Sequence, residues 1–174
     1  MTARIPAWVG DTLMPVDKLE VHRRGLRHMA VSVFVVDRRR LLVQQRALAK
    51  YHTPGLWANT CCTHPHWQEH PDDCAARRLG EELGITDLPL RHRGRLEYRA
   101  EVGGGMIEHE VVDIYLGHSD PSLRIEPDPA EVQDTDWIDL DVLAGQAERK
   151  PERFTPWLRI YLKNHLRTIF GTLH

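Results

Sequence analysis

The chain has 174 residues, of which 41% are hydrophobic and 28% charged, and its formal net charge is -2 at pH 7. This length suits one domain with a substantial core, so a single domain over residues 1–174 is expected. The small net charge gives no electrostatic reason to bind nucleic acid, and no stretch approaches the roughly 18 apolar residues that span a bilayer. The first residues lack the apolar segment of a signal peptide, and three cysteines, two of them adjacent, argue against a disulfide framework. A cytoplasmic protein that neither inserts in a membrane nor binds nucleic acid is therefore expected.

The first half of the chain predicts a β-hairpin, a short strand and a helix. Residues 29–36 form an apolar run of strand length, and residues 41–46 follow as a second strand after a charged turn. Residues 56–59 predict a short strand that leads into the cysteine pair. Residues 71–83 predict a helix, because proline opens the segment, acidic residues occupy its first turn and Gly84 supplies a stop.

The second half predicts another pair of strands and then helices. Strands are expected at residues 91–102 and 107–117, joined by a turn of three glycines, with a last strand at 137–138. A short helix is expected over 140–147 and a longer one over 156–170, where apolar residues recur at helical spacing. This mixture of strands and helices indicates an α/β or α+β fold.

Two alternating carboxylates, Glu108 and Glu110, mark one of the predicted strands. Residues two apart on a strand share a face, so both carboxylates point the same way. Their mutual repulsion must be offset by a cation, by a shared proton or by solvent. A metal ion is the simplest resolution. The alternative is a solvent-exposed strand at the edge of a sheet.

Three histidines, His22, His28 and His64, are candidate partners for these carboxylates. Imidazoles combined with carboxylates suit Mn²⁺, Zn²⁺ or Fe²⁺, and three nitrogens with two oxygens favour a six-coordinate ion over a closed tetrahedral zinc site. Any single histidine is more often structural or merely exposed, and the chain has 11 of them. The prediction of a metal site therefore depends on the whole set.

A second acidic pattern lies along the helix predicted at residues 71–83. The segment 69–85 resembles the Nudix box, whose helix presents carboxylates to a divalent cation that grips a diphosphate. The match is partial, since Thr63 stands in place of the leading glycine and Arg78 in place of a metal-binding glutamate. An arginine there can hold phosphate oxygens, which points away from hydrolysis. The alternative is a surface helix with arginine–glutamate pairs four residues apart.

Further segments extend this resemblance to one family of enzymes. They are residues 18–28, 45–50, 57–65, 108–111 and 154–157. In order and spacing they resemble the type I isopentenyl-diphosphate isomerases, which have the Nudix fold. The resemblance implies a mixed β-sheet sandwich with flanking helices. It also implies an isomerase that interconverts isopentenyl diphosphate and dimethylallyl diphosphate, so that the partner is a small prenyl diphosphate.

The resemblance also implies roles for individual residues. Cys62 and Glu110 would be catalytic, and Glu82 would help to hold a Mg²⁺ on the substrate diphosphate. One Mn²⁺ or Zn²⁺ would be bound by His22, His28, His64, Glu108 and Glu110. The diphosphate would be bound by Lys18, Arg46, Lys50 and Arg78.

The reaction explains why such residues are needed. Moving the double bond adds a proton to one carbon and removes one from another through a carbocation-like state, so two proton-transfer groups must flank the substrate. Cys62 and Glu110 can be these groups. Tyr98 would add a hydroxyl near Glu110, and the aromatic face of Trp157 can stabilise the cation. Core packing is the alternative role for Trp157, and a Nudix diphosphohydrolase or a non-catalytic metal- and phosphate-binding module is the alternative for the chain.

Overall fold

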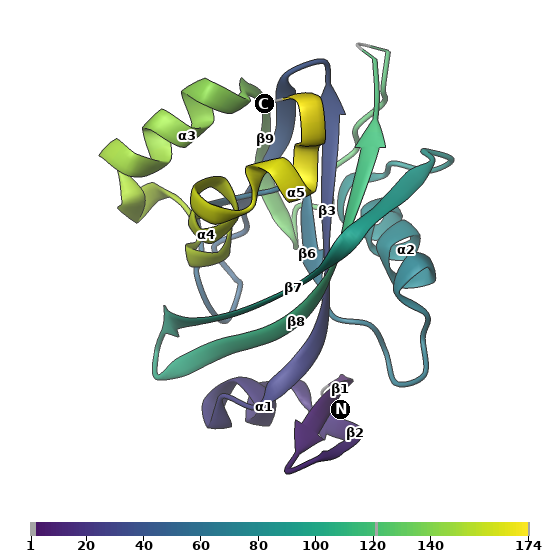
Figure 1. Cartoon of the computed structure of the whole chain (residues 1–174), viewed down its shortest axis with the longest axis vertical. Coiled ribbons are helices and arrows are strands. Elements are labelled where there is room, and N and C mark those ends of the chain that lie inside the picture. The colour runs from purple at the N-terminus through teal and green to yellow at the C-terminus, as the bar shows by residue number, and fades with distance from the viewer. Residues whose placement is uncertain (1–2, 121, 174) are drawn as a thin grey trace.

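The computed structural model describes residues 3–120 and 122–173, which form one mixed β-sheet with helices on both of its faces (Figure 1). The nine strands of the described residues are β1 (Arg4–Val9), β2 (Thr12–Asp17), β3 (Arg27–Asp37), β4 (Arg40–Arg46), β5 (Trp57–Ala58), β6 (Cys61–Thr63), β7 (Leu90–Gly103), β8 (Met106–His118) and β9 (Val132–Asp139). The helices are α1 (Lys18–Arg24), α2 (Pro71–Leu83), α3 (Leu140–Arg149), α4 (Pro156–Asn164) and α5 (Leu166–Phe170), with short 3-10 helices η1 (Pro151–Arg153) and η2 (Gly171–Leu173). The expected mixed sheet with flanking helices is confirmed.

Strand β3 is the central strand on which the sheet is built. Its β-branched and aromatic residues favour an extended chain, and from Ala30 to Asp37 they are buried throughout. β8 runs parallel to β3 along one edge, whereas β6 and β4 pair antiparallel with its other edge. β6 and β8 therefore lie on opposite sides of β3 within the sheet.

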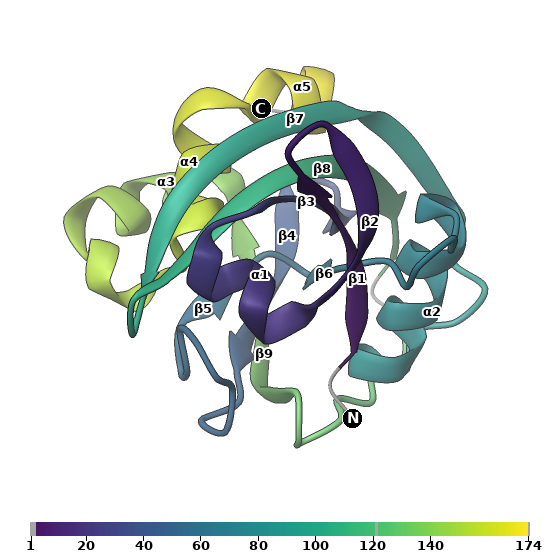
Figure 2. The same ribbon diagram turned by 90° about the horizontal axis from the view of Figure 1, so that it is seen from below.

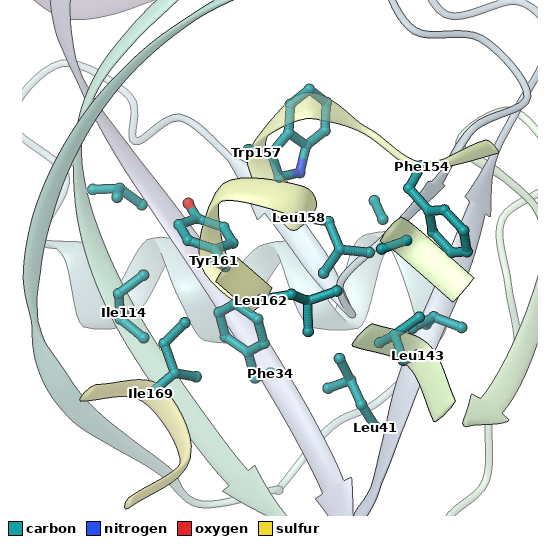
Figure 3. Close-up of a cluster of buried hydrophobic side chains, with 14 of the residues drawn as sticks. Phe34, Leu41, Ile114, Leu143, Phe154, Trp157, Leu158, Tyr161, Leu162 and Ile169 are labelled. Carbon is teal, nitrogen blue, oxygen red and sulfur yellow. The ribbon is translucent and has the colours of Figure 1, made fainter. Parts of the chain in front are cut away.

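The alternation of side chains along β3 divides the core into two layers. Phe34 and its same-face neighbours pack against α3, α4 and α5, whereas Val33 and Val35 pack under α2. Figure 3 shows the first layer, with Tyr161 of α4 next to Phe34 and Trp157 at the other end of the cluster. Because α4 covers the face of the sheet that carries Phe34, its aromatic rings lie over the part of β3 that has β6 on one side and β8 on the other.

Helix α2 has the bounds that the sequence predicts. Pro71 occupies its first turn, and Gly84 ends it with φ 65° in the left-handed region, where glycine carries no steric cost. A Cβ on Gly84 would also lie only 2.8 Å from the side chain of Glu126. The hairpin of β3 and β4 and the glycine turn between β7 and β8 are confirmed as well.

The long helix predicted over 156–170 is wrong. His165 has φ -132°, which is not helical, and the segment divides there into α4 and α5. The strand predicted at 56–59 is limited to β5, and the one at 137–138 is part of the longer β9.

β1, β2 and α1 were not predicted from the sequence; β1 and β2 extend the sheet beyond β3, and α1 lies beside them (Figure 2). They are held there by contacts of α1 with β8 and of β1 with β3. Among the described residues, no helix is long and apolar enough to cross a membrane.

Candidate active site

Four predicted ligands converge from four separate elements. His22 comes from α1, His28 from β3, His64 from the residue after β6 and Glu108 from β8. One ligand atom from each of the four lies within 4.8 Å of all the others. The turn of α1 that carries His22 is fixed by Asp17, whose side chain accepts a hydrogen bond from the backbone N–H of Glu20.

The hydrogen bonds of two histidines show that this group fits a cation. The Nδ1 of His22 lies 2.6 Å from the carbonyl oxygen of Lys18, and the Nδ1 of His28 lies 2.7 Å from that of Leu26. A carbonyl only accepts, so both Nδ1 atoms carry the proton, and in the neutral rings the Nε2 lone pairs are bare. Both Nε2 atoms are 3.1 Å from the same oxygen of Glu108. A lone pair facing a carboxylate is repulsive unless a proton or a metal ion lies between them, which is the arrangement of histidine ligands in metal sites.

Glu110 lies beside this group. Its Oε1 is 3.2 Å from the Nε2 of His64 and 3.8 Å from that of His28, and its Oε2 accepts a hydrogen bond of 2.7 Å from the hydroxyl of Tyr98. The side chains of Glu108 and Glu110 share one face, as the strand period predicts. They are only 2% and 5% exposed, so the alternative of a solvated strand edge is wrong.

The electrostatics of the cluster keep Glu108 ionised. Burial alone would raise its pKa, but hydrogen bonds from four histidines outweigh burial and hold that pKa well below its usual range. Burial likewise lowers the pKa of His28, and its contacts with Glu108 and Glu110 outweigh burial and raise the pKa to about 10. Without a metal, the buried carboxylates are thus compensated in part by a proton on His28.

Cys62, on β6, lines the same cavity as Glu108 and Glu110. Its thiol donates to the Oδ1 of Asn59 at 2.9 Å and lies 3.2 Å from the hydroxyl of Ser32, which in turn contacts the hydroxyl of Tyr161 at 2.9 Å. Burial raises the pKa of the Cys62 thiol. The group is therefore a protonated thiol that can donate a proton.

All four cations that the sequence proposed for a diphosphate line the same cavity. The cavity is lined by Lys18, Arg46, Lys50, Tyr51, His52, Cys62, Thr63, His64, Arg78, Glu108, Glu110 and Trp157. Burial, followed by the nearby charge of Lys50, lowers the pKa of Lys18 to about 8. Two further carboxylates partly balance the cations, since Lys50 contacts Glu131 and Arg78 lies 2.5 Å from Glu82.

Unpartnered nitrogens show what kind of ligand the cavity suits. Among the described residues, four buried side-chain nitrogens have no hydrogen-bond partner, and each belongs to a cavity-lining residue. They are Arg46 Nε, His64 Nδ1, Arg78 Nε and Trp157 Nε1. Buried donors are rarely left without acceptors. A ligand rich in acceptor oxygens would satisfy them.

Glu82 lies behind this cavity and is not among its lining residues. Its carboxylate accepts from the Nε2 of Gln44 at 2.9 Å and from Arg78, and the side chain is almost fully buried. The pairs four residues apart that the sequence indicates, Arg77 with Glu81 and Arg78 with Glu82, are both present. The surface-helix alternative is nevertheless wrong for Glu82, because that carboxylate is enclosed.

The sequence did not single out several residues that contact the site. His52 contacts Glu108, Ser32 and Tyr161 surround the thiol of Cys62, and Glu131 pairs with Lys50. Burial lowers the pKa of His52, so its ring is neutral at pH 7. Ser32 alone had a visible signal, as a polar residue inside the apolar run of β3. The other contacts join segments that no local pattern connects.

The fold and this cavity define the class of protein. A family model described as NUDIX domain matches residues 26–158. Solved structures with the same fold include a MutT NUDIX hydrolase from Burkholderia pseudomallei, with 23% identity and a TM-score of 0.62 over 80% of this chain and 98% of that one. A structure from Deinococcus radiodurans has 13% identity and a TM-score of 0.74 over 92% of this chain and 97% of that one. At these identities the likeness concerns the fold alone.

Curated relatives narrow the class to one family. An isopentenyl-diphosphate Delta-isomerase of Cereibacter sphaeroides is 61% identical over 99% of this chain and 98% of its own length. Proteins of the same name from Dinoroseobacter shibae and Rhodobacter capsulatus are each 60% identical, over 97% and 95% of this chain and 96% and 94% of their own lengths. The chain belongs to the isopentenyl-diphosphate Delta-isomerase family, within the NUDIX domain proteins.

Proposed function

We propose that this protein interconverts isopentenyl diphosphate and dimethylallyl diphosphate. One observation carries the proposal: a protonated thiol, Cys62, and a buried carboxylate, Glu110, line the same cavity as four cationic side chains. The cations suit a diphosphate, and the other two groups suit proton transfer at an alkene. Membership of the isomerase family supports the same activity.

Cys62 and Glu110 act as the two proton-transfer groups. They project from β6 and β8, which pair with opposite edges of β3, so a substrate can lie between them. Tyr98 donates to Glu110 and holds the orientation of that carboxylate, as Ser32 and Asn59 do for the thiol.

Lys18, Arg46, Lys50 and Arg78 bind the diphosphate. Their charge and the unpartnered Nε–H groups of Arg46 and Arg78 supply donors for phosphate oxygens. The diphosphate then replaces Glu131 as a counter-ion of Lys50, which explains why this lysine is already positioned without substrate.

His22, His28, His64, Glu108 and Glu110 would hold one Mn²⁺ or Zn²⁺. Such an ion would supply a fixed positive charge that lowers the pKa of a bound carboxyl group. Glu82, whose carboxylate contacts Arg78, would help to hold a separate Mg²⁺, which would neutralise charge on the diphosphate. The hydroxyl of Tyr98 then keeps Glu110 oriented.

Trp157 stabilises the carbocation-like state through its aromatic face. Its ring is 2% exposed and lies beside Arg46, with 5.3 Å between the guanidinium carbon and the ring centroid. The residue is part of the hydrophobic core as well, so packing and cation stabilisation are compatible. Residues 1–174 act as one domain, and the free thiols of the three cysteines suit a cytoplasmic location.

The NUDIX fold alone does not favour a diphosphohydrolase. Arg78 replaces an acidic residue of the Nudix box, and its guanidinium lies against Glu81 and Glu82. Those carboxylates are consequently neutralised by a fixed cation. The paired proton-transfer groups also have no role in attack by water on phosphorus.

An experiment in D₂O distinguishes the two activities. The purified protein is incubated with isopentenyl diphosphate, Mn²⁺ and Mg²⁺, and the products are followed by mass spectrometry and a phosphate assay. Deuterated dimethylallyl diphosphate without phosphate release is expected. Release of phosphate in place of the isomer would refute the isomerase proposal in favour of hydrolysis.

A further inference from the structure

A fourth histidine contacts the candidate metal site from outside the group of converging ligands. His52 lies in the loop between β4 and β5, is 5% exposed, and places its Nε2 2.9 Å from the Oε1 of Glu108. It comes immediately after Lys50 and Tyr51 in the chain, so the loop that carries a phosphate-binding lysine also carries this imidazole.

The two oxygens of Glu108 face different partners. Oε2 lies 3.1 Å from the Nε2 atoms of both His22 and His28, on the side where the ligand atoms converge. Oε1 is directed to His52 instead. His52 is therefore placed to hold the carboxylate oxygen that the converging histidines leave free.

The two partners of the His52 ring indicate which nitrogen carries the proton, because the carboxylate at Nε2 only accepts whereas the hydroxyl at Nδ1 can donate or accept. Nδ1 lies 3.0 Å from the hydroxyl of Thr53, which can donate to it. The Nδ1 then accepts, the proton of the neutral ring is on Nε2, and Nε2 donates to Glu108. Outer hydrogen bonds of this kind orient the carboxylate ligands of metal sites.

The backbone around His52 is held in one conformation. Thr53 has φ 47°, in the left-handed region that a β-branched residue rarely adopts. The carbonyl of His52 accepts a hydrogen bond of 3.1 Å from the guanidinium of Arg46. A strained residue and a buried charged donor thus fix the loop in the position that brings the imidazole to Glu108.

We propose that His52 is a positioning residue of the metal centre, whose Nε2–H fixes Glu108 in the orientation that binds a divalent cation. This inference rests on the metal site of the proposed function. A purely structural role for the ring would be packing, since it lies edge-on to Trp157 and Tyr51 with centroid separations of 5.8 and 4.4 Å. The two roles differ in whether the N–H matters.

The test compares His52→Leu, which fills space without a donor, with His52→Gln, which keeps an N–H at a similar reach. Mn²⁺ alone is titrated calorimetrically into each metal-free protein, with His118→Leu on an exposed part of β8 as the matched control. We expect His52→Leu to weaken Mn²⁺ binding by about 10–100-fold, and His52→Gln and His118→Leu to bind close to wild type. Thermal unfolding of the metal-free proteins checks that each variant is folded.

The results distinguish a failure of the role of His52 from a failure of the metal site itself. Wild-type affinity in His52→Leu, or equal loss in the Leu and Gln variants, would overturn the positioning role. His64→Ala serves as the reference for the site itself, because it removes a direct ligand. If His64→Ala also bound Mn²⁺ like wild type, the metal site would be wrong and the role of His52 would fall with it.

Discussion

Cys61 and Cys62 are adjacent and chemically identical, yet their surroundings give them different roles. Successive residues on a strand point to opposite faces, so Cys61 packs in the layer under α2 while Cys62 faces the layer of α4. Only Cys62 lines the cavity. At the scale of single residues, access to the cavity therefore follows from the strand register, which pairs Ser32 with Cys62.

Replacing each cysteine in turn tests this assignment. Cys62→Ala should lower isomerisation by about 10²–10⁴-fold, because it removes a proton-transfer group while alanine packs in nearly the same space. Cys61→Ala should leave the turnover near wild type and cost only some stability. Initial rates and thermal melts of both variants provide the measurement. Equal loss of turnover in the two variants would show that Cys62 is not the proton-transfer group.

Removing one cation tests the diphosphate site. Lys50→Ala should lower kcat/KM by about 10–100-fold, mainly through a higher KM, because a phosphate contact worth about 1.5–3 kcal/mol is made in ground and transition states alike. Lys163→Ala is the control, since Lys163 is exposed on α4 and outside the cavity. An unchanged KM in Lys50→Ala would remove this residue from the substrate site.

At the scale of elements, local signals decided which predictions succeeded. Pro71 and Gly84 define both ends of α2, so its bounds could be predicted from the sequence. The break at His165 could not, because leucine and isoleucine continue at helical spacing on either side and only the packing of α5 on β7 and β8 sets the bend. β1, β2 and α1 also escaped prediction, since their stability depends on the sheet.

The candidate site likewise has residues that sequence patterns mark and residues that only long-range contacts bring to it. His22, His28 and His64 were proposed as a set because imidazoles suit a metal beside two carboxylates, and the family resemblance supported the set; their convergence with Glu108 is a property of the fold. His52 was missed because no motif marks it, and its contact with Glu108 joins a loop to a distant strand. Long-range contacts of this kind are absent from local sequence patterns.

The loop before α2 is attached to the helix by a charged pair. Arg77 donates from Nε to the Oε1 of Glu69 at 2.6 Å and from Nη2 to its Oε2 at 2.8 Å. These bonds, which outweigh burial, lower the pKa of Glu69 to about 2. A carboxyl group whose pKa is lower in the folded than in the unfolded state stabilises the fold above its unfolded pKa.

Stability as a function of pH tests this attachment. Glu69→Gln should lower the free energy of unfolding by about 1–2 kcal/mol at pH 7, allowing for solvent screening. The difference from wild type should shrink as the pH falls from about 4.5 towards 2, because Glu69 of the unfolded wild-type chain then takes up a proton while the folded protein keeps this carboxylate ionised. Urea unfolding at several pH values measures it, with Glu148→Gln on the exposed side of α3 as the control. A pH-independent difference would exclude ionisation of Glu69 as the cause.

At the scale of the whole molecule, the candidate metal centre draws its ligands from the N-terminal helix and from the centre of the sheet. The small hydrophobic cluster of β1, β2 and α1 is distinct from the two layers of the main sheet. His22 belongs to α1, whereas His28, His64 and Glu108 belong to the sheet or follow one of its strands. An ion held by all four would add a link between α1 and the central strands to the contacts that α1 already makes with β8, and without the ion the buried carboxylates are compensated in part by a proton on His28.

Removing and restoring metal should consequently change the melting temperature. At a Mn²⁺ concentration about 100 times the Kd, binding adds about 2.7 kcal/mol to the free energy of unfolding, which for a chain of this size raises Tm by about 5–10 °C over the chelator-treated protein. The gain should decline as the pH falls below about 10, the pKa of His28 without metal, because protons then compete with the ion for this imidazole. Differential scanning calorimetry of wild type and His64→Ala measures this gain, with His118→Ala as a control that should respond like wild type.

Mg²⁺ should raise the melting temperature less than Mn²⁺ does, because imidazole nitrogens suit Mn²⁺ better. A shift in His64→Ala as large as in wild type would mean that the stabilising ion binds elsewhere, and the four elements would then have to be held together by the sheet and its hydrophobic layers alone.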